Sequence, residues 1–118
     1  MEITRGDLIM VDLEPKKGSE QGKTRPCIVI QNDVGNAHAP TTIVAALSSS
    51  YSEVYPTDVE IRAEEEEVNR DTKAMLNQIF TIDQQKRIKK KFGKITGEKM
   101  NEIDEAIEIS LGLSQDLK

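Results

Sequence analysis

The sequence of 118 residues is poor in the side chains on which metal and disulfide chemistry depend, because it contains one cysteine, Cys27, and one histidine, His38. A single cysteine excludes an internal disulfide, and a zinc site built from cysteines or paired histidines lacks its ligands. Aromatic side chains are scarce too, with no tryptophan, two tyrosines and two phenylalanines. No run approaches the ~18 consecutive apolar residues of a membrane-spanning helix, and the N-terminus shows no signal-peptide pattern. We therefore expect a cytoplasmic protein that uses neither a membrane nor a bound metal or other cofactor.

Charge is distributed unevenly along the chain. The net charge is −5, from 16 basic and 21 acidic residues, yet the stretch Gln84–Lys94 contains no acid. Its cations are Lys86, Arg87, Lys89, Lys90, Lys91 and Lys94. RNA affinity depends on the cations that face the RNA backbone, so an acidic protein can still bind RNA at such a patch. Charge runs are more often only a solvated surface, and on charge alone both interpretations stay open.

Short β-branched runs separated by turn residues predict one mainly β domain over residues 1–118. The expected strands are 8–13, 27–31, 41–47, 57–62, 74–80 and a last one around 92–95. Residues 32–40 form a connection rich in turn residues, and a short helical turn is expected over 83–88. From Glu98 onward the apolar residues follow helical spacing, with Thr96 as the expected N-cap. This pattern indicates an α+β fold, a small antiparallel β-barrel with a C-terminal α-helix.

The long loop after the first strand holds the densest set of polar residues. It reads KKGSEQGKT from Lys16 to Thr24 and is followed directly by Arg25 and Pro26. The glycines permit close approach of the backbone to a ligand, Glu20 can exchange a proton, and the Arg25 guanidinium offers a fork to a phosphoryl oxygen. The spacing is not that of a nucleotide-binding P-loop, and the same letters also suit an ordinary hairpin loop.

The order of several short motifs along the chain is more specific than this loop alone. These motifs are Arg5-Gly6-Asp7, Val11-Asp12-Leu13, Gly18-Ser19-Glu20-Gln21-Gly22, Arg25-Pro26, Ile30-Gln31-Asn32-Asp33, Pro40-Thr41 and Thr81-Ile82-Asp83. In this order, and over almost the whole chain, the sequence resembles the MazF/PemK family of toxin endoribonucleases.

The resemblance implies an SH3-like β-barrel of the CcdB/PemK plasmid-maintenance toxin type, a homodimer, and neutralisation by a MazE-like antitoxin. The implied reaction is metal-independent, sequence-specific cleavage of single-stranded RNA, which leaves a 2′,3′-cyclic phosphate and a 5′-hydroxyl. Such a reaction requires proton removal from the ribose 2′-hydroxyl, stabilisation of the phosphorane charge and protonation of the leaving oxygen. None of these steps needs a metal ion.

The resemblance also implies roles for individual residues. Arg25 matches the catalytic arginine, Ser48 stands where the family places a threonine hydroxyl, and Glu20 matches a loop acid assigned to proton transfer or RNA contact. The implied RNA-binding residues are Ser19, Gln21, Lys16, Lys17, Lys23, Asn32, Asn77, Gln78 and Phe80. Asn77 stands where the family commonly has an acidic residue, and Phe80 where it commonly has a basic residue. We therefore expect an altered preference for the RNA sequence. Phe80 could stack on a base or belong to the core.

Two other functions remain as alternatives. A toxin of the same fold could bind DNA gyrase without catalysis, or the barrel could be a degenerate RNA-binding module.

Four other residues are assigned no catalytic role. His38 lies where the family keeps no histidine, and Cys27 is expected to be a small buried apolar side chain. Asp7 and Asp12, which flank the first strand, are expected to serve turns or salt bridges.

Overall fold

A computed structural model of the chain describes residues 2–13 and 24–114, and within these ranges it consists of one six-stranded antiparallel sheet and three helices. The strands are β1 (Asp7–Asp12), β2 (Thr24–Val29), β3 (Thr41–Ser48), β4 (Asp58–Ile61), β5 (Thr72–Asp83) and β6 (Ile88–Lys94). The helices are α1 (Asp33–His38), α2 (Gln84–Arg87) and α3 (Gly97–Ser110). The order across the sheet is β4-β5-β3-β2-β1-β6, which confirms the six expected strands and the terminal helix.

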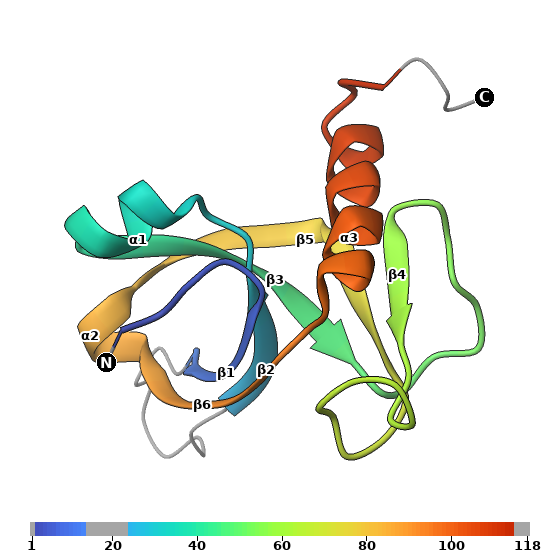
Figure 1. Cartoon of the computed structure of the whole chain (residues 1–118), viewed down its shortest axis with the longest axis horizontal. Helices are drawn as coiled ribbons and strands as arrows, with labels where there is room; N and C mark the ends of the chain where they lie inside the picture. Colours follow the sequence, from blue (N-terminus) through green and yellow to red (C-terminus); the bar gives the residue numbers. More distant parts are fainter. Residues whose placement is uncertain (1, 14–23, 115–118) are drawn as a thin grey trace, which may run out of the picture.

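The sheet has an apolar cluster on each side, because successive strand residues point to opposite faces. Beneath α3 lies the first core, which includes Leu8, Ile28, Ala45, Leu47, Leu76 and Ile103. The second core includes Ile9, Val11, Cys27, Val29, Val44 and Ile82. Figure 1 shows α3 beside β4 at one end of the molecule and α1 and α2 at the other. Each strand in the centre of the sheet is therefore apolar on both faces, as its β-branched sequence predicted.

The sheet is curved like a barrel, but its edge strands β4 and β6 are not hydrogen-bonded to each other. The connection between β4 and β5 bridges the gap with two acidic side chains. Glu67 accepts a hydrogen bond from the Lys94 N–H (3.1 Å), and Glu66 accepts from the N–H and the hydroxyl of Thr96 (2.9 Å each). Thr96 is also the N-cap of α3, as expected, since its hydroxyl accepts from the Lys99 N–H. Part of the acidic run Glu64–Glu67 thus has a structural role.

Helix α1 lies inside the connection that the sequence indicated as a series of turns. Asn32 caps it by accepting a hydrogen bond from the Gly35 N–H at 2.7 Å. Asn36 is buried, accepts from the Thr42 hydroxyl (2.6 Å) and donates to the Gln31 carbonyl oxygen (3.0 Å). A polar helix of six residues has no apolar periodicity to reveal it. Its stability comes from these side-chain bonds to neighbouring segments.

The residues that were expected to lack a catalytic role have ordinary structural environments. Cys27 is fully buried in β2, and burial raises the pKa of its thiol to about 12. Asp7 is buried and pairs with Lys91 and Lys94, both at 3.4 Å, which confirms its salt-bridge role. His38 is the last residue of α1 and is exposed, at the end of the molecule away from α3.

Candidate functional site

The polar loop after β1 lies outside the described residues, and with it six of the expected site residues. These are Lys16, Lys17, Ser19, Glu20, Gln21 and Lys23. The described chain stops at Leu13 and resumes at Thr24, whose Cα pairs with that of Asp12 in the adjacent strand. The remaining members of the expected site are described and belong to β2, β3, β5 and the N-cap of α1.

Arg25 belongs to β2, which begins three residues earlier than the sequence predicted. It pairs with Val11 of β1 and is exposed. Its charge lowers the pKa of Cys27, partly offsetting the effect of burial on that thiol, as expected for two residues on the same strand face. Within the described ranges, the Arg25 guanidinium makes no hydrogen bond or ion pair. None of its donors is therefore used by the described residues, and we take them as the candidate donors to a phosphate.

Ser48 ends β3 on the strand next to Arg25. The two strands pair at Ile28↔Ala45 and Cys27↔Ala46, and continuing this register by two residues sets Arg25 opposite Ser48. The Ser48 hydroxyl accepts from the Ser50 N–H and donates to the Ser50 carbonyl oxygen, both at 3.2 Å. Rotation about the side-chain bond would release that long donor bond for a phosphate oxygen.

Pro26 explains why the ladder stops just before these two residues. Ile30 donates its N–H to the Ile43 carbonyl oxygen of β3 at 2.9 Å, so alternation directs the Pro26 nitrogen at β3 as well. Proline has no amide hydrogen, and a ladder bond is lost at this point. The pairing of β2 with β3 ends at Cys27↔Ala46, and Arg25 and Ser48 lie where the two strands are no longer hydrogen-bonded.

The expected RNA-binding residues of β5 lie at an irregularity in its pairing with β3. Ala45 pairs with Ile79 and Ala46 with Met75, so residues 76–78 form a bulge. Asn77 and Gln78 are exposed there, as a binding role requires. Phe80 pairs with Val44 and packs, half-buried, against the second core, so its ring has a structural role and keeps an accessible part.

Asn32 is separated from this group. It lies beyond the end of β2 opposite to Arg25 and serves as the N-cap of α1. The structure thus brings Arg25 and Ser48 to one end of the sheet and leaves Asn32 at the other. Its side-chain oxygen already accepts the Gly35 N–H, while its amide nitrogen can still donate.

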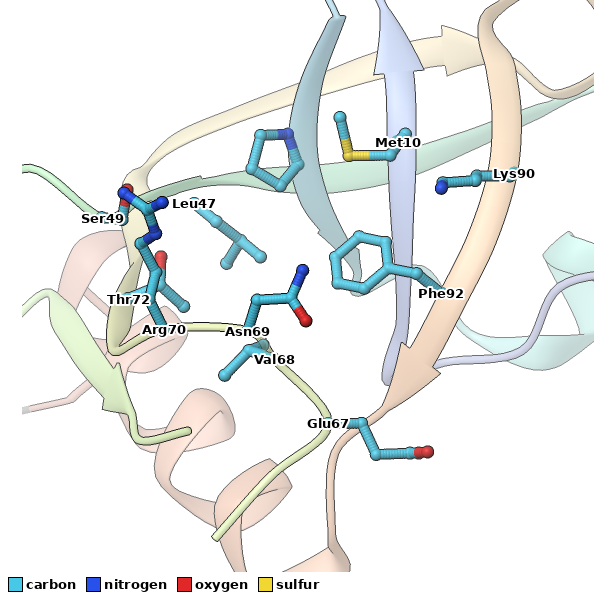
Figure 2. Close-up of a pocket in the computed structure, with 11 residues that line it drawn as sticks. Met10, Leu47, Ser49, Glu67, Val68, Asn69, Arg70, Thr72, Lys90 and Phe92 are labelled. Carbon is cyan, nitrogen blue, oxygen red and sulfur yellow. The ribbon is translucent and has the colours of Figure 1, made fainter. Parts of the chain in front are cut away.

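A cavity of about 330 Å³, shown in Figure 2, is lined by residues adjacent in sequence to the candidate pair. Pro26 and Ser49 line it, and because they directly follow Arg25 and Ser48, their side chains point to the opposite face. Met10, Leu47 and Phe92 supply its apolar wall, and Figure 2 shows the Phe92 ring extending from β6 toward Asn69.

Two cations stand at the cavity without a partner in the described structure. Arg70 and Lys90 both line it, and neither side chain forms an ion pair or a hydrogen bond with another described residue. No pattern in the sequence indicated a role for Arg70, and the only signal for Lys90 was its place in the basic stretch 84–94. Lys91 and Lys94 of the same stretch instead pair with Asp7, so only part of that stretch is available to a ligand.

Neither a metal nor a membrane is indicated by the described residues. They contain no group of three or more His, Cys, Asp or Glu side chains that could hold a metal ion. No helix in residues 2–13 or 24–114 is long and apolar enough to cross a membrane.

Comparison with known proteins places these features in a family. The family described as PemK-like, MazF-like toxin of type II toxin-antitoxin system matches residues 4–111. The chain is 45% identical over 113 residues to the endoribonuclease MazF of Staphylococcus epidermidis, and the match covers 95% of this chain and 93% of that protein.

Solved structures share the fold at low sequence identity. An endoribonuclease in complex with its cognate antitoxin, from a mycobacterial species, has a TM-score of 0.78 and 21% identity, covering 95% of this chain and 97% of that one. A MazE-MazF structure from Deinococcus radiodurans has a TM-score of 0.78 and 19% identity, covering 97% and 99%. These likenesses confirm the expected fold, and the sequence match confirms the resemblance. The chain belongs to the PemK-like, MazF-like family of toxins of type II toxin-antitoxin systems.

Proposed function

We propose that this toxin is an endoribonuclease that cleaves single-stranded RNA at the end of the sheet where β2 and β3 separate. The proposal is supported by the register between β2 and β3, which sets Arg25 opposite Ser48 when it is extended by two residues beyond its last pair. The Arg25 guanidinium also has no partner among the described residues. The 45% identity to an endoribonuclease supports the proposal as well. The sequence around each residue does not by itself predict that Arg25 and Ser48 face each other, because that depends on how β2 pairs with β3.

The reaction we propose is an internal transfer at phosphorus. The ribose 2′-oxygen forms a bond to phosphorus, the bond from phosphorus to the 5′-oxygen breaks, and the products are a 2′,3′-cyclic phosphate and a 5′-hydroxyl. The 2′-hydroxyl proton passes to a base, for which Glu20 is the candidate, and the leaving 5′-oxygen takes a proton from water. Arg25 stabilises the charge on the phosphorane, and Ser48 holds a phosphate oxygen in place.

The RNA strand is held by residues around this point. The candidates in the polar loop are Lys16, Lys17, Ser19, Gln21 and Lys23. Asn32, at the other end of the sheet, is a further candidate. Asn77, Gln78 and the accessible part of Phe80 are exposed on β5 and are the candidates for reading bases. Arg70 and Lys90, whose side chains are unpaired among the described residues, offer two further cations to the RNA at the cavity on the opposite face of the sheet.

We further propose that the toxin is a homodimer in the cytoplasm and is neutralised by a MazE-like antitoxin. Two of the structures with this fold contain an antitoxin or are named MazE-MazF. An acidic antitoxin segment would bind the same cations as RNA, because a protein with a net charge of −5 attracts such a segment only where its cations are concentrated. Competition between RNA and antitoxin peptide for one site, measured with both ligands present, tests this model.

One experiment tests the activity directly. The purified protein is incubated with a long single-stranded RNA in EDTA, and the 5′-hydroxyl ends of the fragments are sequenced. Specific fragments with cyclic-phosphate ends support the endoribonuclease and give its recognition sequence. RNA binding without fragments would indicate a degenerate binding module, and inhibition of gyrase without RNA cleavage would indicate the gyrase-binding alternative.

A further inference from the structure

Lys73 of β5 is a buried lysine whose ammonium group is fully engaged. Its side chain is only 10% exposed, and Nζ donates to Asp58 Oδ2 at 2.7 Å and to the Glu53 carbonyl oxygen at 3.0 Å. Lysine is almost never buried unless it is paired, because desolvation of the charge is costly. The buried charge of Lys73 therefore needs an explanation, which we look for in the groups that it binds.

The ammonium group holds the segment between β3 and β4, residues 49–57. Nζ lies 5.1 Å from the centre of the Tyr55 ring and 5.7 Å from that of Tyr51. The Tyr51 hydroxyl donates to Glu60 at 2.7 Å, and the Tyr55 N–H donates to the same Asp58 carboxylate that Lys73 binds. Two aromatic rings, one backbone carbonyl and one carboxylate thus converge on Lys73, and three of these four groups come from residues 49–57.

Lys73 is also the cross-strand partner of Ser48. The two Cα atoms pair directly in β3 and β5, and Lys73 pairs in turn with Glu60 of β4. Directly opposed strand residues have Cβ atoms roughly 4.5–5.5 Å apart. Ser48 is the last residue of β3 before residues 49–57, and its hydroxyl is bonded to Ser50 within that segment. The segment therefore holds the Ser48 oxygen through the Ser50 N–H, while the hydroxyl proton can still turn toward a phosphate oxygen.

We propose that Lys73 is a positioning residue for RNA cleavage: by holding residues 49–57, it fixes the Ser48 hydroxyl where a phosphate oxygen is received. This inference rests on the proposed function. A purely stabilising role explains the observations less well, because buried ion pairs contribute little net stability compared with apolar side chains of similar volume. What an apolar side chain could not supply is the directional bond to Glu53 and the attraction to two ring faces.

The test uses variants that separate the geometry from folding. Lys73→Met keeps the length of the side chain but leaves the Asp58 carboxylate buried without its partner, so the double variant Lys73→Met/Asp58→Asn is made beside it. The matched control is Lys99→Met. Lys99 belongs to α3, pairs with Glu102 at 3.1 Å and has a side chain only 14% exposed, and its ion pair is with a residue of α3.

The first measurement follows the segment itself by tyrosine absorbance during a pH titration. Tyr51 and Tyr55 are the only tyrosines, and the chain has no tryptophan, so the signal comes from residues 49–57 alone. Burial and the bond to Glu60 raise the pKa of Tyr51 to about 12 in the parent protein. Release of the segment would expose the Tyr51 hydroxyl and break its bond to Glu60, the two causes of the raised pKa. We therefore expect this pKa to fall toward the ordinary value of about 10 in the double variant, despite the loss of the Lys73 charge, and to stay unchanged in Lys99→Met.

The second measurement is the kinetic coupling between Lys73 and Ser48. We expect kcat to fall at least tenfold in the folded double variant, with KM changed less than threefold. Ser48→Ala should then cost less than a further twofold in that background, although it costs at least tenfold in the parent. Full multiplication of the two losses, or a kcat equal to that of the parent, would overturn the positioning role. A parent that does not cleave RNA would overturn the proposed function and this role with it, and the tyrosine titration would still show whether Lys73 holds the segment.

Discussion

Arg25→Ala is the substitution that most directly separates catalysis from folding. Arg25 is exposed, and its guanidinium makes no hydrogen bond or ion pair within residues 2–13 and 24–114. A surface substitution of this kind changes stability by about 0.5 kcal/mol or less. A preorganised donor to a charged transition state is worth far more, about 3 to 4 kcal/mol of activation free energy. The variant should therefore melt with the parent while its cleavage rate falls roughly 100- to 1000-fold.

Two further variants sharpen this prediction. Arg25→Lys keeps the charge but not the planar fork of donors, so its rate should lie between those of the parent and Arg25→Ala. Arg62→Ala is the matched control, because Arg62 is an exposed arginine whose ion pair with Glu64, at 3.2 Å, lies on the surface. It should change neither the rate nor the melting temperature.

The assay is single-turnover cleavage of a fluorescent single-stranded RNA in EDTA, run beside a thermal melt of each variant. Excess enzyme separates the chemical step from product release. If Arg25→Ala cleaves within a few-fold of the parent, the catalytic assignment is wrong. If it instead loses several degrees in melting temperature, Arg25 stabilises the fold through contacts that the described structure does not contain.

Three more predictions concern other residues of the sheet and of its connections. Ser48→Ala should lose at least tenfold in cleavage rate with an unchanged melting temperature. Ser48→Thr should keep or raise activity, because the γ-methyl group of threonine restricts rotation of the hydroxyl. Equal rates for the parent and Ser48→Ala would remove Ser48 from the site. Arg70→Ala and Lys90→Ala should each weaken RNA binding and lower the slope of log affinity against log salt by about 1, and an unchanged slope would show that the cation does not contact RNA. Stability to urea should fall as the pH rises from about 9, because the raised pKa of Cys27, about 12, means that the folded state retains a proton that the unfolded state loses. Cys27→Ala should flatten that decrease, and a parent whose stability is constant up to pH 11 would refute it.

The local sequence pattern was sufficient to predict those strands and helices whose formation depends on their own residues. Strand β3 is a β-branched run bounded by turn residues, and α3 combines a helical stripe with the Thr96 cap, so both follow from short stretches of sequence. The order of motifs around Arg25 was by itself specific enough to indicate the family. The buried state of Cys27 followed from its place in an apolar strand.

The tertiary structure decided what depends on partners distant in sequence. Extending the register between β2 and β3 by two residues sets Arg25 opposite Ser48. The bulge at residues 76–78 shifts the register between β3 and β5. Helix α1 depends on Asn36 bonding to Thr42 and Gln31. The burial of Lys73 depends on a carboxylate 15 residues before it and a carbonyl 20 residues before it. Periodicity reports which face of an element is apolar, but it contains no information about which distant polar group lies opposite, because chain pairing alone creates that contact.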